Sequence, residues 1–358
     1  MMKKILKIVL LVLLGLILLA GVGGFLMFRE EVKIISSIKP LDDEHSVFVM
    51  EYDTDYHLDE LMKRGAMSDK ELSERLTNYI SHGFDSADNS VPMALGCSTL
   101  TTVSSEGNMV WGRNFDWTES VPIIVKSTPK EGYASISTCE FSNITGDSSA
   151  KPESMEQKFL AVAAYYVPMD GINEKGLCVA DLEVNEGGME FVDTDKINLT
   201  VTMAIRLLLN RAATVDEAIE LLNMYDIAPS GGISHHLSIS DATGKSVCVE
   251  FMKGEIVVVD TPYVTNFNLA NGDIEAGGDS ARDRYLTLEE EYKKAYGVMD
   301  LSQVTSSMEM AAQKEGKWRT QWTLCYEHRK EQLIAFYYFD GEFKKPVTVT
   351  LGATIVTE

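Results

Sequence analysis

Residues 96–117 read GCSTLTTVSSEGNMVWGRNFDW and contain two strand-like runs on either side of a turn. Residues 97–104 are rich in Thr and Val, residues 105–108 (SEGN) supply turn chemistry, and the strand pattern resumes at residues 109–113. This pattern predicts a β-hairpin. The hairpin opens the strand-rich part of the chain, and its first strand begins with a thiol, Cys97.

The position of the turn predicts which side chains lie opposite Cys97. With the turn centred near residue 105 or 106, Cys97 faces one of residues 113–116, which are Arg-Asn-Phe-Asp. Arg113 and Asp116 are therefore expected beside the thiol. A guanidinium stabilises a thiolate, and a carboxylate can hold an ammonium group or a thiol proton.

Outward from the hairpin, short strands and helices alternate in groups rather than in a regular βαβ order. This grouping predicts an α+β layered fold. Thr214 and Glu217 form a capping box at the start of one of the helices. We expect strands at residues 122–127, 159–167, 177–184, 236–240, 246–251 and 255–259, helices at 198–212, 215–225, 282–296 and 302–313, and a closing strand pair at 318–326 and 332–339.

Composition excludes several classes of protein. The chain has 358 residues, 45% of them hydrophobic, which is too apolar for a disordered protein and long enough for a large core. Its net charge of -22 repels nucleic-acid phosphates, so nucleic acid is not an expected partner. The five cysteines show no CxxC spacing, which argues against a disulfide scaffold and a zinc ribbon.

The N-terminus predicts a membrane anchor. Residues 8–28 carry no charge, three lysines precede them, and Arg29, Glu30 and Glu31 follow. This length matches the ~20 residues that cross a bilayer as a helix, and the flanking charges place the rest of the chain outside the cytoplasm. We expect a single-pass protein of the cell membrane with an extracytoplasmic catalytic domain, or a secreted protein if residues 1–28 are a cleaved signal.

Residues 29–96 are predicted to be a linker and helical prosegment ahead of a catalytic domain at residues 97–358. Residues 29–56 read as a linker with one strand at most. Residues 58–84 have helical spacing, and Ser68 with Glu71 resembles a capping box. Residues 85–92 (DSADNSVP) are polar and rich in turn formers, so an exposed loop is expected just before Cys97.

A nucleophilic cysteine needs a base. A Cys/His pair is conceivable with six histidines, but the chain has no Cys/His signature of the papain or caspase kind. Another solution is to cut the peptide bond before the cysteine. The freed α-amine, with an unperturbed pKa of about 7.7–8.0, can act as a general base near neutral pH. The location of Cys97 after a prosegment and a polar loop suits that solution.

Seven motifs in order support this hypothesis: residues 97–99 (CST), 112–117 (GRNFDW), 170–177 (DGINEKGL), the helix 213–222 (ATVDEAIELL), the strand pair within 236–251, residues 265–266 (TN) and 279–285 (DSARDRY). On these motifs the chain resembles the choloylglycine hydrolase and acid ceramidase family of N-terminal-nucleophile (Ntn) cysteine amidases. The resemblance covers about residues 94–340. It implies a four-layer αββα sandwich.

The resemblance also implies roles for individual residues. Cys97 would be the nucleophile and, through its freed α-amine, the base. Arg113 and Asp116 would orient it and balance its charge, and Asn266 would donate a hydrogen bond to the tetrahedral oxyanion. The late arginine of the family would be Arg284, which precedes an aromatic residue; the alternative is Arg282, which would then be expected nearby as a substrate-binding residue.

Two departures from bile salt hydrolases bear on the substrate. Glu183 stands where bile salt hydrolases have a second oxyanion asparagine, which puts bile salt specificity in doubt. The long segment before Cys97 is instead similar to the ceramidase branch. Glu183 is thus a candidate substrate-binding residue. Trp117 is a candidate for the wall of an acyl pocket, although such aromatic residues more often pack in a core.

These observations predict a hydrolase that cleaves the linear amide bond of a small N-acylated amine. The alternatives are an acyltransferase that uses the same thioester, an enzyme with a bile-salt or penicillin V acylase-type substrate, and a catalytically silent binding protein. No cofactor or metal is expected: residues 235–236 (His-His) lack partners at metal-ligand spacing and read as a strand start. Cys139, Cys178, Cys248 and Cys325 are read as structural thiols. A homo-oligomer is left open.

Overall fold

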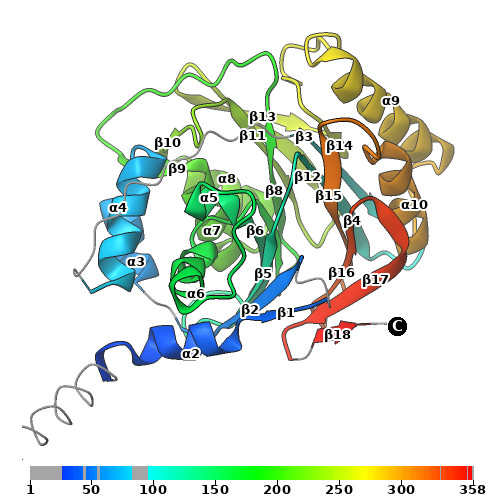
Figure 1. Cartoon of the computed structure of the whole chain (residues 1–358). Helices are drawn as coiled ribbons and strands as arrows, with labels where there is room; N and C mark the ends of the chain where they lie inside the picture. Colours follow the sequence, from blue (N-terminus) through cyan, green and yellow to red (C-terminus); the bar gives the residue numbers. More distant parts are fainter. Residues whose placement is uncertain are drawn as a thin grey trace, which may run out of the picture.

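The computed structural model describes residues 26–42, 46–54, 57–82, 96–330, 332–352 and 354–356, and within them two large sheets stack face to face (Figure 1). The first has nine strands, in the order β1 (Lys39–Pro40), β2 (Phe48–Tyr52), β5 (Pro122–Ser127), β6 (Ser135–Glu140), β7 (Asp170–Asn173), β8 (Cys178–Glu183), β11 (His235–Ser240), β12 (Ser246–Met252) and β13 (Glu255–Asp260). The second has seven, in the order β14 (Tyr263–Val264), β3 (Gly96–Val103), β4 (Met109–Trp117), β15 (Arg319–Glu327), β16 (Ile334–Phe339), β17 (Glu342–Thr350) and β18 (Thr354–Val356).

Helices cover the outer face of each sheet (Figure 1). The seven-stranded sheet is covered by α9 (Gly278–Lys294) and α10 (Leu301–Ala311), which share a hydrophobic cluster with β3 and β4. The nine-stranded sheet is covered by α7 (Val201–Arg211), α8 (Val215–Leu222) and the shorter helices described below. The result is four layers, helix–sheet–sheet–helix, so the prediction of an α+β layered fold is confirmed. A small parallel pair, β9 (Ile197–Thr200) and β10 (Tyr225–Ala228), lies beside α7.

Alternation along β4 explains how the layers separate. Trp111 and Phe115 belong to the hydrophobic cluster between the two sheets, whereas Val110 belongs to the cluster under α9 and α10. Gly112 faces the same outer side, where an added Cβ would come within 2.6 Å of the Met308 side chain, so a side chain there would push α10 away from the sheet. Every residue of β4 is buried. The odd-numbered side chains point inward between the two sheets, and the even-numbered ones point outward toward α9 and α10.

The hairpin forms as predicted. β3 and β4 are antiparallel with Cys97 paired to Phe115, inside the predicted window of residues 113–116. Gly107 occupies the turn with φ of 84°, a backbone conformation that favours glycine. The turn therefore predicts the register to within four residues, and the structure fixes the pairing of Cys97 with Phe115.

The segment before the hairpin is part of the same architecture. Ahead of β1, residues predicted as linker form α2 (Arg29–Ser37), and β2 pairs in parallel with β5 inside the nine-stranded sheet. Two further helices follow, α3 (Leu58–Arg64) and α4 (Asp69–Ile80), and their apolar faces join the hydrophobic cluster of α7. The predicted cap is confirmed, since the Ser68 side chain accepts a hydrogen bond from the Glu71 N–H.

One predicted strand is wrong. Residues 159–167 fall within α6 (Met155–Ala161) and a 3-10 helix, η1 (Val162–Tyr165); the short α5 (Ser142–Thr145) precedes them. Ser154 caps α6 by accepting from the Gln157 N–H. A short apolar run is compatible with either a buried strand or a buried helix. Here the run is helical, because it packs in the helical layer on the outer face of the nine-stranded sheet.

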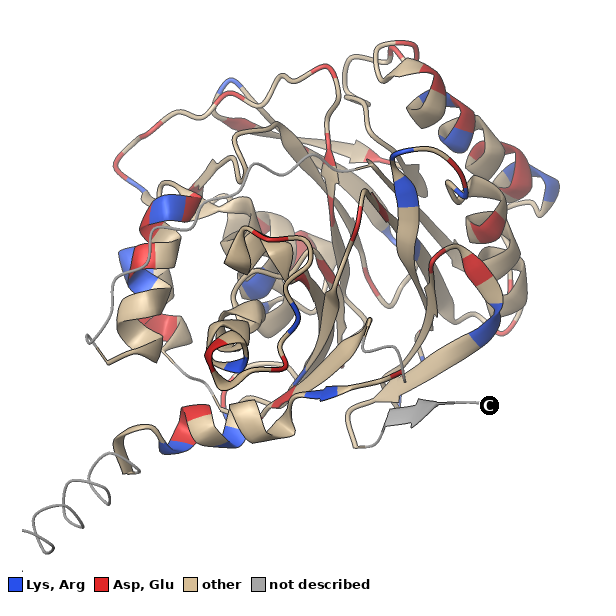
Figure 2. Ribbon diagram, in the orientation of Figure 1, with Lys and Arg blue, Asp and Glu red and all other residues tan. Residues whose placement is uncertain are grey.

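Charged side chains concentrate on the helices and loops at the surface, and α9 carries acids and lysines side by side (Figure 2). Among the described residues, no helix is both long and apolar enough to cross a bilayer. Residues 8–25 of the predicted anchor and residues 85–92 of the predicted loop lie outside the described residues.

Candidate active site

Cys97 is the second residue of β3 and lies in the interior between the two sheets. Its side chain is 0% exposed, and its Sγ accepts a hydrogen bond of 3.3 Å from Arg113 Nη1. Arg113 is two residues from Phe115, the partner of Cys97, so it shares the inner face of the sheet with the thiol. The structure thus places Arg113 where the sequence predicted it.

Arg113 is itself fixed by three buried oxygens. Its Nε lies 2.7 Å from a carboxylate oxygen of Asp170, and its two Nη atoms donate to the carbonyl oxygens of Asn114 (2.7 Å) and Asp181 (3.1 Å). Asp170 also accepts a hydrogen bond of 2.8 Å from the indole N–H of Trp322. The sequence analysis missed Asp170 as a site residue, although it begins the motif at residues 170–177; the motif does not show that its first side chain turns toward the thiol.

The thiol is neutral in the intact chain. Burial raises the pKa of Cys97 to about 12, against the opposing effect of the Arg113 guanidinium. At neutral pH a base is therefore needed to generate the thiolate. Arg113 can stabilise that thiolate once formed, but it cannot take the proton.

Asp116 lies on the opposite face of the sheet from the thiol, which corrects the expectation that it sits beside Cys97. It pairs with Gly96, and its carboxylate accepts hydrogen bonds from Thr320 Oγ1 (2.6 Å) and Gln313 Nε2 (2.7 Å). It also forms an ion pair of 3.3 Å with Arg284. Asp116 is thus next to the Gly96–Cys97 peptide, on the backbone side of Cys97.

Asn266 and Arg284 hold the backbone of Cys97. The Asn266 Oδ1 accepts from the Cys97 N–H (2.8 Å) and from Arg284 Nη2 (2.7 Å), while Arg284 Nη1 donates to the Cys97 carbonyl. Asn266 Nδ2 donates to the backbone carbonyl of Glu183 (2.9 Å). Asn266 is therefore an acceptor for the Cys97 N–H, and its own N–H group is directed to the Glu183 carbonyl.

The structure distinguishes the two candidate arginines by their positions. Arg284 is buried against Cys97, Asn266 and Asp116, whereas Arg282 is directed outward and forms ion pairs with acidic residues near the start of α9. Of the two, the structure brings Arg284 to Cys97.

A pocket of about 320 Å³ reaches Gly96, the residue before Cys97. Glu183, Arg284 and Trp318 contribute to its wall together with Gly96, Asn266 and Gln313. Trp117 is packed behind this wall, with its ring centroid 5.6 Å from that of Trp318. The pocket therefore presents a carboxylate, a guanidinium and an aromatic surface near the bond that precedes Cys97.

Two stacked sheets between helical layers, with a cysteine near the start of a central strand and its backbone N–H and carbonyl held by polar side chains, are the features of an Ntn hydrolase. Residues 97–271 match the family model described as linear amide C-N hydrolases, choloylglycine hydrolase family. Over this region the chain is similar to that family.

Sequence and structure comparisons agree with this assignment. The bile salt hydrolase/transferase of Lactiplantibacillus plantarum is 27% identical over 192 residues, which cover 50% of this chain and 54% of the relative; the chain thus spans about half the length of that relative. Among solved structures, a variant of conjugated bile acid hydrolase from Clostridium perfringens has a TM-score of 0.53 at 18% identity, covering 73% of this chain and 97% of that one. Penicillin V acylase from Agrobacterium tumefaciens has a TM-score of 0.51 at 18% identity, covering 70% and 84%. At this identity the two structures show a shared fold.

Proposed function

We propose that this protein hydrolyses the linear amide bond of a small N-acylated amine, with Cys97 as an N-terminal nucleophile released by cleavage of the Gly96–Cys97 bond. The proposal rests on the fact that both the side chain and the backbone of Cys97 are held by polar or charged side chains. Arg113 contacts its thiol from one face of the strand, and Asn266 with Arg284 binds its backbone. A core cysteine with a purely structural role needs none of these charged and polar partners.

In the intact chain the thiol of Cys97 is inaccessible to a substrate, and no base among the described residues is hydrogen-bonded to it to take its proton. Cleavage before Cys97 would remove both obstacles. The thiol is fully buried, and the pocket reaches Gly96 without including Cys97 among the residues that line it. Displacement of Gly96 after cleavage would open the pocket toward the thiol. It would also convert the Cys97 amide into an α-amine, with an unperturbed pKa of about 7.7–8.0, held by the Asn266 Oδ1.

The catalytic cycle then follows from these positions. The α-amine of Cys97 takes the thiol proton, and the thiolate attacks the amide carbonyl carbon of the substrate. The resulting α-ammonium group protonates the leaving amine as the C–N bond breaks, which leaves a thioester on Cys97. Water, deprotonated by the α-amine, attacks the thioester and releases the carboxylic acid and the thiol.

The decisive test is the N-terminal sequence and mass of the purified protein. We expect a fragment of about 29 kDa that begins with Cys97, from 262 of the 358 residues of the 39.7 kDa chain. Cys97→Ala should remain full length and inactive, whereas Cys178→Ala, a buried cysteine on β8, should still be cleaved. A wild-type protein that hydrolyses amides as a single uncut chain would contradict the mechanism, and a cleaved protein that turns over no amide would support a binding role instead.

Acyl transfer is the second candidate function, because the Lactiplantibacillus plantarum relative is a bile salt hydrolase/transferase. It differs only in whether water or an amine attacks the thioester. Adding hydroxylamine during turnover should divert part of the product to a hydroxamate if amines compete with water. Release of free acid alone at high hydroxylamine concentration would leave hydrolysis as the activity.

We further propose that residues 8–28 anchor the protein in the cell membrane and place residues 29–358 outside the cytoplasm. The support is the uncharged run of the sequence with lysines before it and acids after it. The uncleaved precursor should then remain in the membrane during carbonate extraction, and protease added to intact cells should digest the catalytic region. Recovery of the catalytic region from the cytosol would refute this topology.

A further inference from the structure

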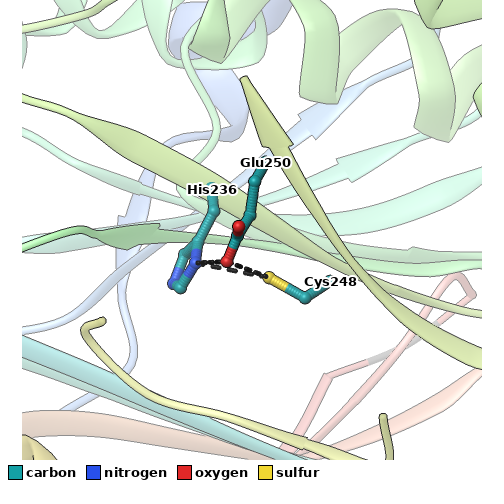
Figure 3. Close-up of side chains that lie close together, drawn as sticks. All are labelled: His236, Cys248 and Glu250. Atoms are coloured by element: carbon teal, nitrogen blue, oxygen red, sulfur yellow. Dashed lines mark hydrogen bonds and ion pairs between the residues drawn. The ribbon is translucent and has the colours of Figure 1, made fainter. Parts of the chain in front are cut away.

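A second buried cluster of reactive side chains lies between the sheets, on the strands β11 and β12. His236 pairs directly with Glu250, and Cys248 pairs with Ser238 in the same ladder. Paired residues and residues two apart on one strand point to the same face of a sheet. His236, Cys248 and Glu250 therefore share one face, where their side chains converge (Figure 3). They are 0%, 0% and 1% exposed, respectively.

The distances between the three side chains match those of metal ligands. His236 Nδ1 lies 3.3 Å from Cys248 Sγ and 3.8 Å from Glu250 Oε1, and Cys248 Sγ lies 3.9 Å from Glu250 Oε1. In a tetrahedral zinc site with Zn–S of about 2.3 Å and Zn–N or Zn–O of about 2.1 Å, ligand atoms are roughly 3.4–3.6 Å apart. Each observed edge of the triangle is within a few tenths of an ångström of that value.

The carboxylate of this triangle is already oriented by the backbone. Glu250 Oε1 accepts a hydrogen bond from the Leu269 N–H, and Oε2 accepts one of 3.2 Å from the Ala270 N–H. Such outer hydrogen bonds fix the direction of a ligating carboxylate. They also connect the cluster to the segment that carries Asn266, three residues before Leu269.

Two other interpretations account less well for the cluster. A second Cys/His/Glu nucleophile would need access for a substrate, but all three side chains are buried, and burial together with Glu250 raises the pKa of Cys248 well above its usual value. A core held only by hydrogen bonds pairs the buried His236 Nδ1 with the Cys248 thiol, which is a weak hydrogen-bond partner. A coordinate bond from Nδ1 to a metal ion would replace that weak contact.

We propose that His236, Cys248 and Glu250 bind one divalent transition-metal ion of the zinc type. Imidazole, thiolate and carboxylate are all zinc ligands, and the thiolate selects against magnesium and calcium. On binding, Cys248 releases its thiol proton to solvent, and the sulfur lone pair forms the bond to the metal. Three protein ligands leave the fourth tetrahedral position to water.

The metal would act as a structural clamp. It would join β11 to β12, and through Glu250 it would hold residues 269–270, close to Asn266 and therefore to Cys97. The ligands are buried, so the metal would enter as the protein folds rather than by diffusion into the finished fold.

The test uses the full chain carrying Cys97→Ala, so that the nucleophile cannot supply a thiolate. This protein is refolded with one equivalent of Co²⁺, and its absorption spectrum is recorded. We expect thiolate-to-cobalt charge-transfer bands in the near ultraviolet, visible bands of tetrahedral cobalt, and loss of both on competition with Zn²⁺. Elemental analysis should give about one metal per chain.

Further variants locate the ligands. Adding Cys248→Ser should abolish the charge-transfer bands, and adding Glu250→Gln should weaken cobalt binding at least tenfold. Adding Cys178→Ser is the matched control, because Cys178 is equally buried on the neighbouring strand β8, and it should leave the spectrum unchanged. If Cys248→Ser does not refold, the cobalt affinity of Glu250→Gln tests the proposed site instead.

Two outcomes would overturn the proposal. One is a folded Cys97→Ala protein that holds less than a tenth of an equivalent of Co²⁺ or Zn²⁺ after refolding with either ion. The other is a charge-transfer spectrum that persists in Cys248→Ser, or unchanged cobalt affinity in Glu250→Gln, which would place the metal elsewhere in the chain.

Discussion

At the scale of single residues, Cys97 is held from both faces of its strand. Arg113 contacts the thiol from the inner face, and Arg284 reaches the carbonyl of the same residue from α9 on the outer face. Asn266 completes the arrangement by binding the Cys97 N–H and Arg284 together. The three contacts fix the sulfur, the carbonyl and the nitrogen of one residue. Small displacements of any of them should therefore affect both cleavage and turnover.

We predict that Arg284→Gln slows both self-cleavage and amide hydrolysis, each by about 100-fold, because a displacement near 1 Å at a reacting group costs that much. Arg282→Gln is the matched control: it removes the same charge on the same helix, but from a side chain directed toward solvent. Rates of fragment formation and of substrate turnover measure the effect. Equal losses in the two variants would show that α9 contributes only its overall charge.

Glu183 should decide which amines the pocket accepts. Its side chain lines the pocket, so a carboxylate there repels an anionic leaving group such as a glycine or taurine conjugate. The mature enzyme should cleave N-acyl amides of neutral amines faster than taurocholate-type conjugates, and Glu183→Asn should narrow that gap by roughly tenfold, equivalent to about 1.4 kcal/mol. Values of kcat/KM for both substrate sets between pH 4 and 8 provide the measurement.

Glu190→Asn makes the same change of charge at an exposed position outside this pocket and should leave the ratio of the two activities unaltered. Faster hydrolysis of the anionic conjugates by wild-type protein would overturn the specificity argument.

At the scale of elements, β11 also carries a buried ion pair. His235 Nδ1 lies 2.9 Å from Asp181 Oδ1, and its Nε2 lies 2.7 Å from the carbonyl oxygen of Ser230. Both partners are acceptors, so both ring nitrogens must carry protons. Burial is the largest single effect and opposes this charge, but Asp181, the Ser230 carbonyl and Asp69 together outweigh it and raise the pKa of His235 above its usual 6.5. The charged ring thereby links β11 to β8.

The sign of this shift predicts a pH dependence of stability. Because the folded pKa is raised, the contribution of His235 is fully present below pH 6.5 and is lost as the pH rises through the folded pKa. The free energy of unfolding of wild type should therefore exceed that of His235→Gln most at pH 6, and the difference should shrink toward pH 9. Urea denaturation of the Cys97→Ala chain, with and without His235→Gln, measures it.

His328→Gln is the control for this experiment. Burial lowers the pKa of His328, so its removal should not produce a difference that shrinks as the pH rises. A difference for His235→Gln that is constant from pH 6 to pH 9 would show that the ring is not charged in the fold.

The helices of the prosegment contribute to the main hydrophobic core. Leu61 of α3 is fully buried in the cluster that contains α7. Leu61→Ala should lower the free energy of unfolding of the uncut chain by about 2–5 kcal/mol, the usual cost of truncating a buried leucine. Met67→Ala, in the exposed connection between α3 and α4, should change it by less than about 0.5 kcal/mol. Equal and small effects would show that α3 is only loosely attached.

At the scale of the whole molecule, cleavage at Gly96–Cys97 would divide the chain without dividing the fold. β2 lies within the nine-stranded sheet between β1 and β5, and α2, α3 and α4 cover the hydrophobic cluster on its outer face. Loss of these elements would expose the edge of β5 and the apolar surface beneath the helices. The two fragments should therefore remain together after cleavage.

Native size-exclusion chromatography should show both fragments in one particle, and denaturing electrophoresis should separate them. A fragment of about 29 kDa that elutes alone and retains amidase activity would contradict this prediction.

Local features were predictable because local interactions determine them. The hairpin turn sets the pairing of Cys97 with Phe115, and the Ser68 and Thr214 hydroxyls accept from N–H groups three residues later. The order of motifs led to the Ntn fold and to Arg113, Asn266 and Arg284, all of which the structure brings to Cys97. For the hairpin and the helix caps the information lies within a few residues, whereas Asn266 and Arg284 were predicted through the resemblance to a known family.

Other features depended on the tertiary structure. A shift of the turn by one position exchanges the two faces of a strand, so the predicted window could not place Asp116 on the outer face. The apolar run at residues 159–167 is helical because of the layer it packs under. The partners of His236 lie on the next strand, where no sequence spacing identifies metal ligands.

The sequence by itself therefore indicated the candidate nucleophile, its strand and the family that the chain resembles, since turn chemistry is local and the order of motifs can be read along the chain. Only the tertiary structure decided which atoms meet. Asp170 reaches Arg113 and Arg284 reaches Cys97 across large separations in sequence, because the stacking of two sheets and the docking of α9 bring them together. Such contacts depend on the packing of all four layers at once, and no short stretch of the chain encodes that packing.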